Sequence, residues 1–227
     1  MNPIISSQQA HFYKQNGYIE FEAIFSATEC TTLQDQLQTI LFSRLKRKLR
    51  HIPAKELYEN GRDLWREHNS LKSTLLARRM TSIALGLVNK HQLRLGCDQW
   101  IEAGCEWTKQ VKLNTLIGLQ NIACGFLIRM TDPQKEEPVQ PTFLQEIGLI
   151  PLPAQRGNAL IVAPQLLLNF PKLAIFSPTN LYLVVYTHTN AVYIHSTTDP
   201  LNKQLKSMGY NFGDTLNNQS HPLIMNS

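Results

Sequence analysis

The sequence has no long apolar run. Nothing in its 227 residues approaches the roughly 20 consecutive apolar residues that span a bilayer. The first residues, MNPIISSQQAHFYKQNGY, also lack the basic start and apolar core of a signal peptide. Four cysteines occur without a Cys-x-x-Cys pair, which argues against a disulfide framework and against a zinc ribbon. We therefore expect a cytoplasmic protein with buried free thiols.

Neither sign of charge is abundant. The chain has 22 Lys and Arg against 17 Asp and Glu, a formal net charge of +5. This balance is too weak for a dedicated nucleic-acid coat. No Gly-x-Ser-x-Gly, P-loop or Gly-x-Gly-x-x-Gly motif occurs, which removes the usual signatures of hydrolases and nucleotide-binding folds. With 43% hydrophobic residues the chain can bury one substantial core, so we expect a single domain over 1–227.

Residues 1–90 are expected to form mainly helical support. Ser6 or Ser7 can cap a short helix that stops at Gly17, and the alternating stretch YIEFEAIF predicts a strand. The Ser-x-x-Glu box SATE then opens a long helix with an apolar stripe. The stripe consists of Leu33, Leu37, Leu41, Leu45 and Leu49. Further helices are expected after Pro53 and after Ser70.

Residues 91–199 change character and read as strands. Short apolar runs are separated by Gly, Pro and polar turns, and the polar stretch TDPQKEEPVQP reads as a surface loop. The runs are LRLGCDQWI, IACGFLIRM, NALIVAP, NLYLVVYT and AVYIH. Residues 200–227 are expected to form a C-terminal helix and tail. Helices followed by strands indicate an α+β fold in which helices brace one face of a curled sheet.

The stretch FYKQNGYIEFEAIFSATEC resembles the N-terminal helix, strand and helix of the phytanoyl-CoA dioxygenase-like family, which are non-haem Fe(II)/2-oxoglutarate oxygenases. The glycine before the strand RGNALIVAP and the tyrosine-bearing strand YLVVYT extend the resemblance over most of the chain. The chain also resembles a small group of chlamydial hypothetical proteins. The resemblance implies an α+β double-stranded β-helix, a cupin-like jelly roll with N-terminal supporting helices.

The iron ligands of that family are missing from the sequence. The family binds iron through His-x-Asp or His-x-Glu plus a distal His, and neither tripeptide occurs here. If GCD is the matching tripeptide, Gly96 replaces the His and only Asp98 keeps a ligand type. No His follows Gly157 in its strand, where Asn169 is the nearest polar residue, and FSPTN carries no Arg for the cosubstrate. Fe(II) and 2-oxoglutarate are therefore the family's cofactors, but we expect none here.

Two interpretations of the expected pocket remain open. The pocket is expected to contain Asp98, Trp100, Tyr186 and His188, although Trp100 is also explained by packing. In one interpretation the protein is not a catalyst, and the mouth of the barrel binds a small molecule or a protein partner. In the other, Asp98 joins some of His91, His188 and His195 in a rearranged oxygenase site.

A basic segment is expected to end the long helix. Its cations are Arg44, Lys46, Arg47, Lys48 and Arg50. Cations at a helix C-terminus complement the helix dipole and keep one face solvated, which is the simpler explanation. The alternative is a divalent-cation-dependent DNA-binding transcriptional regulator that uses this segment as a polyanion site. No helix-turn-helix or Cys-x-x-Cys supports that alternative, so we expect no nucleic acid, no membrane, and an unknown small molecule or protein as the partner.

Overall fold

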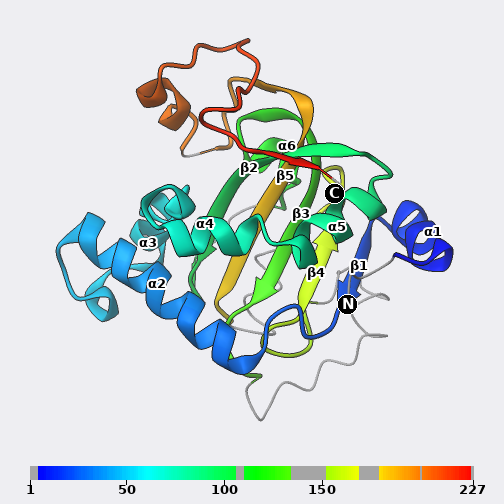
Figure 1. The fold of residues 1–227 in the computed structure, drawn as a ribbon. Coiled ribbons are helices and arrows are strands. Elements are labelled where there is room, and N and C mark those ends of the chain that lie inside the picture. Colours follow the sequence, from blue (N-terminus) through cyan, green and yellow to red (C-terminus); the bar gives the residue numbers. More distant parts are fainter. Residues whose placement is uncertain (1–4, 106–109, 134–151, 169–178, 200, 226–227) are drawn as a thin grey trace.

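The computed structural model describes residues 5–105, 110–133, 152–168, 179–199 and 201–225. Within this part of the chain, six strands form one sheet in the order β1-β4-β3-β5-β2-β6, and every neighbouring pair is antiparallel (Figure 1). The strands are β1 (Tyr18–Phe21), β2 (Gln92–Ile101), β3 (Leu119–Arg129), β4 (Ala159–Val162), β5 (Leu181–Tyr193) and β6 (Leu223–Met225). The two longest strands, β3 and β5, lie at the centre of the sheet.

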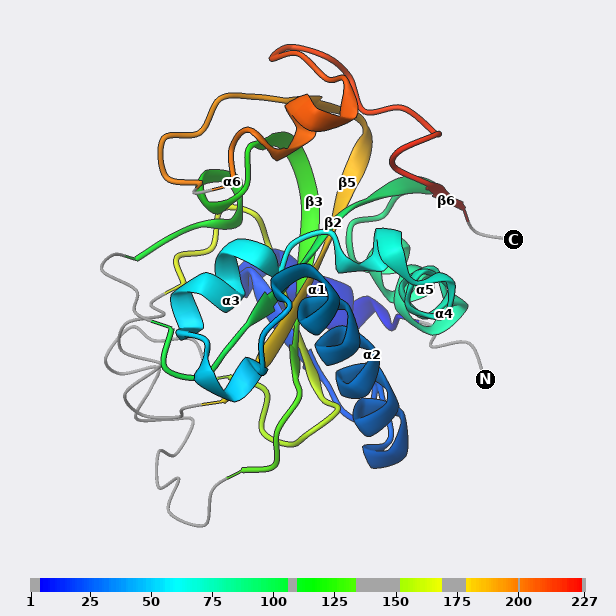
Figure 2. The same cartoon turned by 90° about the vertical axis from the view of Figure 1, so that its left-hand side faces the viewer.

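The α-helices are α1 (Ser7–Asn16), α2 (Ala27–Leu45), α3 (Ala54–Asn60), α4 (Asn69–Leu75), α5 (Arg78–Leu87) and α6 (Leu113–Leu116). Three short 3-10 helices accompany them: η1 (Leu49–His51), η2 (Leu64–Glu67) and η3 (Gln204–Met208). Helices α2, α4 and α5 cover one side of the sheet, whereas α6 lies on the other side (Figure 2). No described helix is both long enough and apolar enough to cross a membrane.

The helix signals at the N-terminal end are confirmed. Ser6 caps α1 in a reciprocal capping box with Gln9, and Gly17 ends the helix in the left-handed conformation with φ 75°. Ser26 and Glu29 form the expected capping box at the start of α2. These short sequence patterns depend only on neighbouring residues, which is why they could be recognised without the structure.

Several expected element boundaries are wrong. Helix α2 ends at Leu45 because Lys46 adopts a left-handed conformation with φ 54°, so Leu49 leaves the stripe and enters η1. The helix expected after Ser70 is two helices that break at Leu76 and Ala77. NLYLVVYT and AVYIH are not separate strands: β5 runs through both. Most of the expected loop TDPQKEEPVQP lies outside the described residues.

The two faces of the sheet pack against different cores. On the helix side, Leu95, Phe126 and Val184 belong to the same apolar cluster as Leu37 of α2 and Leu71 of α4. On the opposite side the packing is also dense, and the residues there form a second apolar cluster. Its members from the sheet and α6 include Cys97, Leu113, Leu127, Leu160, Leu183 and Val185. Side chains alternate between the faces of a strand, so each strand residue is assigned to one core or the other.

Gly157 provides a test of this packing. Its φ is +86°, and a Cβ there would lie 2.0 Å from the carbonyl oxygen of Phe25. The backbone N–H of Phe25 donates to the carbonyl of Gly157, and this hydrogen bond joins the segment before α2 to the segment before β4. We expect Gly157→Ala to lower the free energy of unfolding by more than about 2 kcal/mol, because it combines backbone strain with a backbone clash. The matched control is Gly209→Ala, at φ +88° with no atom within 4 Å of the added Cβ. This control should cost only about 1 kcal/mol, and equal losses for the two variants in urea unfolding would contradict the account.

Candidate functional site

Strand β2 sends the residues of the GCD tripeptide in different directions. The register with β5 shifts between Leu95 and Cys97, so Gly96 lies in a bulge. Cys97 then faces the second apolar cluster, on the side of the sheet away from α2. Asp98 faces the helices, because its Oδ2 accepts hydrogen bonds from the backbone N–H of Trp65 (3.1 Å) and from the hydroxyl of Tyr182. The Asp98 carboxylate therefore lies on the opposite side of β2 from the Cys97 thiol.

There is no space beside Gly96 for a side chain. A Cβ at this position would lie 2.8 Å from the Cγ2 of Thr187 and 3.1 Å from the carbonyl oxygen of Val185. Both neighbours belong to β5, which pairs with β2 along this stretch. A histidine at this position would require β2 and β5 to separate.

The Asp98 carboxyl group lies in an environment that disfavours its charge. Burial, and secondarily the nearby Asp63 carboxylate, raises the pKa of Asp98 to about 7 despite the hydrogen bonds from Tyr182 and Trp65. Its Oδ1 has no hydrogen-bond partner among the described residues. A carboxyl group of this kind is a poor ligand for a cation unless the cation replaces the missing partner.

Asp98, Trp100, Tyr186 and His188, the four residues expected to form a pocket, line neither the small cavity beside Gly96 nor the open groove along the C-terminal half of α2. Trp100 and Tyr186 lie on the helix face with Asp98 and are fully packed in the first cluster. The Tyr186 hydroxyl donates to the carbonyl of Leu75 (2.6 Å), so it fixes α4 to β5. His188 is half-buried in the middle of β5, where burial and the charge of Lys90 lower its pKa. The packing explanation holds for Trp100, since its face of β2 is covered by helices.

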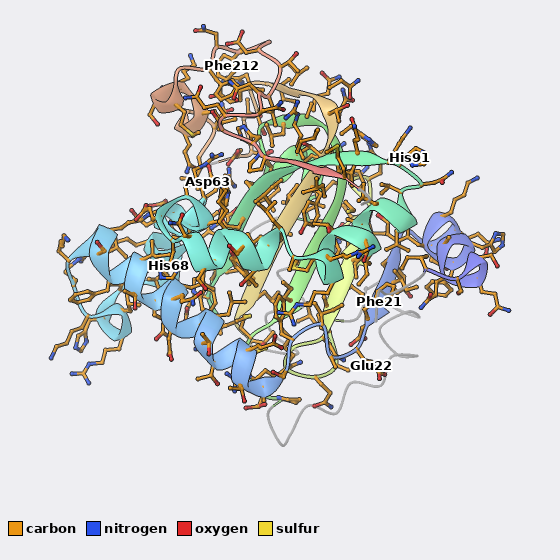
Figure 3. The ribbon with its side chains drawn as sticks, in the orientation of Figure 1. Phe21, Glu22, Asp63, His68, His91 and Phe212 are labelled. Atoms are coloured by element: carbon orange, nitrogen blue, oxygen red, sulfur yellow. The ribbon has the colours of Figure 1, made fainter. Side chains whose placement is uncertain are left out.

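The histidines of the rearranged metal site lie apart. His91 and His195 are exposed, and the ring of His195 contacts Phe212 at a centroid distance of 5.3 Å. His91 precedes β2 on the opposite side of the molecule from Asp63, whose backbone N–H binds the carbonyl of Asp98 (Figure 3). In the part of the chain that the structure describes, no three His, Cys, Asp or Glu side chains form a group that could hold a metal ion.

A different polar group occupies the side of β2 that faces away from α2. Arg62 donates through Nη1 to both carboxylate oxygens of Asp199 at 2.8 Å, and through Nε to Oε1 of Gln99 at 3.0 Å. Both charged side chains are almost completely buried. Asp199 also accepts the backbone N–H groups of Gly118 (2.8 Å) and Leu201 (2.9 Å). Although burial opposes it, the Asp199 carboxylate raises the pKa of Arg62 above its usual range, so the guanidinium is charged.

This ion pair lines a small cavity, and Gly96 is another of its lining residues. The cavity has a volume of about 20 Å³, room for about one water molecule. We call it the Arg62–Asp199 pocket. Its other polar residues include Asp63 and Gln204.

Three buried atoms of the pocket residues have no hydrogen-bond partner among the residues that the structure describes: Nη2 of Arg62, Oδ1 of Asp63 and Oε1 of Gln204. One water can accept from the guanidinium and donate to both oxygens, which matches the one missing acceptor and two missing donors. Asp63 adopts a left-handed conformation with φ 56°, which is uncommon for a residue other than glycine. The pocket thus combines several buried polar groups with an apolar lining, and it is small.

The basic segment is partly engaged within the protein. Arg44 donates to Oε1 of Glu67 (2.7 Å) and to the backbone carbonyls of Asn60 and Arg62, so it fixes the turn before η2. Arg47 pairs with Glu56 of α3. Lys46, Lys48 and Arg50 are exposed, and none of the described residues forms an ion pair with them. Three of the five cations are therefore available to a partner.

Sequence reasoning missed the Arg62–Asp199 pocket. The two residues are 137 positions apart, in the turn sequence NGRDLW and in the polar stretch TTDPLNK. No local pattern connects them. The one available signal was that both are charged residues next to apolar segments, which is too common to identify a buried pair.

No protein-family profile matches the sequence, and no curated protein matches it. Solved structures do match. The non-haem α-ketoglutarate-dependent carbocyclase SnoK of nogalamycin biosynthesis is 18% identical, with 97% of this chain and 96% of SnoK covered and a TM-score of 0.68. CytC3 with Fe(II) and α-ketoglutarate is 14% identical over 99% of this chain and 89% of that chain, with a TM-score of 0.63. CT296 from Chlamydia trachomatis is 12% identical over 82% and 98%, with a TM-score of 0.49, too low to support an inference.

The chain therefore has an α+β double-stranded β-helix fold, the fold of Fe(II)/2-oxoglutarate oxygenases, as the resemblance implied. In the part of the chain that the structure describes, the residues around Gly96 and Asp98 do not form a suitable site for the iron of these oxygenases. A charged guanidinium lines the pocket beside Gly96, and the Asp98 carboxylate faces the helices instead. Asn169, the residue nearest to the position of the distal histidine, lies outside the described residues, as does most of FSPTN.

Removing one member of the buried ion pair should be costly. We expect Asp199→Ala to lower the free energy of unfolding by about 3–5 kcal/mol, because it leaves Arg62 charged and buried. The double variant Arg62→Met with Asp199→Leu should recover part of this loss. Asp132→Ala is the matched control, because Asp132 is 77% exposed and lies 3.6 Å from Arg156. It should cost less than about 1 kcal/mol, and a similar cost for Asp132→Ala and Asp199→Ala in denaturant unfolding would refute the assignment.

Asp98 predicts a specific pH dependence. Its pKa is about 7 in the folded protein and about 4 in an unfolded chain, so the folded state holds the proton more tightly. Its contribution to stability should therefore fall as pH rises from about 4 to about 7, and should be constant above that range. In Asp98→Asn this fall should disappear, and the difference between the two proteins should change by at most about 4 kcal/mol across the window. Thermal unfolding at a series of pH values tests this, and parallel profiles would rule out the raised pKa.

Proposed function

We propose that this protein is a non-catalytic binding protein, which keeps the fold of Fe(II)/2-oxoglutarate oxygenases and recognises a protein partner through its surface. The observation that supports the proposal best is the buried ion pair between Arg62 and Asp199. This pair shares a pocket with Gly96, the residue at the expected position of the first iron ligand. If GCD matches the iron-binding tripeptide, a buried ion pair lies beside the position at which an oxygenase needs open coordination positions.

Charge supports the same conclusion. A guanidinium remains protonated at any physiological pH and would repel Fe²⁺ placed beside it. Asp199, a carboxylate on that side of β2, already accepts two backbone N–H groups in addition to Arg62. Releasing it to bind a metal would leave Arg62 buried without its counter-ion, which is the expensive state of a broken buried pair.

Size argues against a small-molecule substrate in the same place. The Arg62–Asp199 pocket has a volume of about 20 Å³. Pockets that bind drug-sized ligands have volumes of roughly 300–1,000 Å³. Binding such a ligand would require the segment around Asp199 and Gln204 to move away. A protein partner that docks on the surface requires no such opening.

The other two functions have less support. The rearranged oxygenase needs Asp98 and several histidines on one side of the sheet, whereas His91 and His195 are exposed and Asp98 faces the helices. The DNA-binding regulator needs the basic segment as a continuous cationic surface, but Arg44 and Arg47 are paired within the protein. The proposal includes a cytoplasmic location, which the four free cysteines suit because a reducing compartment keeps thiols unpaired.

Metal and cosubstrate binding test the proposal. We expect anaerobic calorimetric titration with Fe(II), with and without 2-oxoglutarate, to show no stoichiometric site, because the ligand positions are occupied or turned away. CytC3, whose structure holds Fe(II) and α-ketoglutarate, serves as the positive control. The Asp98→Asn variant serves as the negative control, since Asp98 is the remaining residue of the ligand type at the matching tripeptide.

One equivalent of Fe(II) that is lost in Asp98→Asn would overturn the proposal in favour of a rearranged oxygenase. Weak binding that is equal in the wild-type protein and in Asp98→Asn would count as adventitious and would leave the proposal standing. Elemental analysis of the purified protein provides a second readout that does not depend on turnover.

A further inference from the structure

An open groove lies along the C-terminal half of α2, on the face turned away from the core. Its volume is about 730 Å³. It is lined by Asp35, Thr39 and Phe42 of α2 and by Lys48, Leu49 and Arg50 of the following turn and η1. We call it the α2–η1 groove.

The end of α2 creates this groove. Lys46 closes the helix in a left-handed conformation, and its N–H binds the carbonyl of Phe42. The chain then turns back, so that η1 lies beside the helix that it follows (Figure 1). Leu49 contributes to the first apolar cluster from its edge, and it also reaches the groove. The groove therefore has an apolar base that continues into the core of the protein.

The packing of α2 on the sheet does not explain why Phe42 is exposed. The opposite face of the helix buries Leu37 and Leu41, which is enough to fix α2 on the sheet. Phe42 nevertheless remains 52% exposed, in a hollow rather than on a convex surface. A large aromatic side chain in a surface hollow is a typical anchor point for a protein partner.

The charges around the groove are mainly positive. Lys48 and Arg50 line it, and Lys46 precedes Lys48 by two residues in the chain. None of the three has an ion-pair partner within the described ranges. The one acidic lining residue is Asp35, toward the N-terminal side of the groove. Apolar contact at Phe42 and Leu49 is thus combined with cations at one end.

We propose that the α2–η1 groove binds a short acidic segment of a partner protein, which places aliphatic side chains on Phe42 and Leu49 and carboxylates against Lys48 and Arg50. This inference rests on the proposed function, and it names the partner's chemistry and the docking surface. A helical turn suits the groove, because residues one turn apart present two apolar side chains to the same surface.

Two other occupants fit less well. A nucleic acid would bring phosphates against Asp35, and its affinity would depend on several cations, two of which are paired internally in this segment. A second copy of this chain would bring another molecule of net charge +5 toward the same cations. An acidic segment is the one occupant of the three whose charge is complementary to the groove.

Fluorescence anisotropy with a labelled synthetic peptide tests the proposal. The peptide carries two leucines at positions i and i+4, flanked by glutamates. We expect Phe42→Ala, and separately the pair Lys48→Glu with Arg50→Glu, to weaken binding by roughly tenfold or more. All three residues are solvent-accessible, so the variants should fold, which circular dichroism will verify. The wild-type affinity should also fall as salt rises.

Matched controls come from α1 at the opposite edge of the molecule (Figure 1). Phe12 is 42% exposed and Lys14 is exposed, and neither lines the groove. Phe12→Ala and Lys14→Glu should change the affinity less than twofold, whereas a loss equal to that of Phe42→Ala would overturn the proposal. Peptides with lysine in place of glutamate, or alanine in place of leucine, should bind at least tenfold more weakly.

Three other outcomes would also overturn it: no binding of the acidic peptide, tighter binding of a single-stranded oligonucleotide that the same variants abolish, or a dimer in sedimentation that Phe42→Ala dissociates. None of these readouts involves iron. A failed peptide experiment with no Fe(II) binding would remove the groove and leave the non-catalytic assignment. Stoichiometric Fe(II) with intact peptide binding would do the reverse.

Discussion

The buried ion pair between Arg62 and Asp199 determines how one end of this molecule is built. Two opposite charges inside a protein are tolerable only when each is paired and the remaining hydrogen-bonding positions are satisfied. Here Arg62 holds Asp199 and Gln99, while Asp199 also holds the backbone N–H groups of Gly118 and Leu201. The pair therefore ties the turn before η2 to β2, to the start of β3 and to the C-terminal segment. The same arrangement lines the small pocket beside Gly96.

The alternation of side chains along β2 explains why Asp98 faces the helices and not the Arg62–Asp199 pocket. The bulge at Gly96 sets which residues face which core, and it directs Cys97 away from the helices and Asp98 toward them. On that side Asp98 receives hydrogen bonds from Trp65 and Tyr182 and helps to fix η2 on the sheet. Asp98, whose side chain suggested a metal ligand in the sequence, thus helps to hold the structure together. Its raised pKa follows mainly from burial.

The parts of the fold that depend on neighbouring residues could be predicted from the sequence, and those that depend on distant contacts could not. The helix cap at Ser6, the capping box at Ser26 and the stop at Gly17 are local, and all three are confirmed. The end of α2 was placed too late, because the leucine spacing continues to Leu49 while a left-handed Lys46 interrupts the helix. The pocket residues were expected from the two strands that contain Asp98 and Tyr186, whereas the observed pocket joins Arg62 and Asp199, which lie outside both strands and 137 positions apart. The resemblance gave the fold, but spacing alone could not show which face of β2 each residue occupies.

We propose that the buried ion pair between Arg62 and Asp199 stands in place of a metal at this end of the fold. Anomalous diffraction from crystals grown without oxygen, in the presence of Fe(II) and 2-oxoglutarate, tests that claim most directly. We predict that the Arg62–Asp199 pair will be intact, with no anomalous peak at the iron edge in the pocket beside Gly96. A peak there at ligand distance from Asp199 or Cys97, or one bound to the Oδ1 atom of Asp98, would contradict the account.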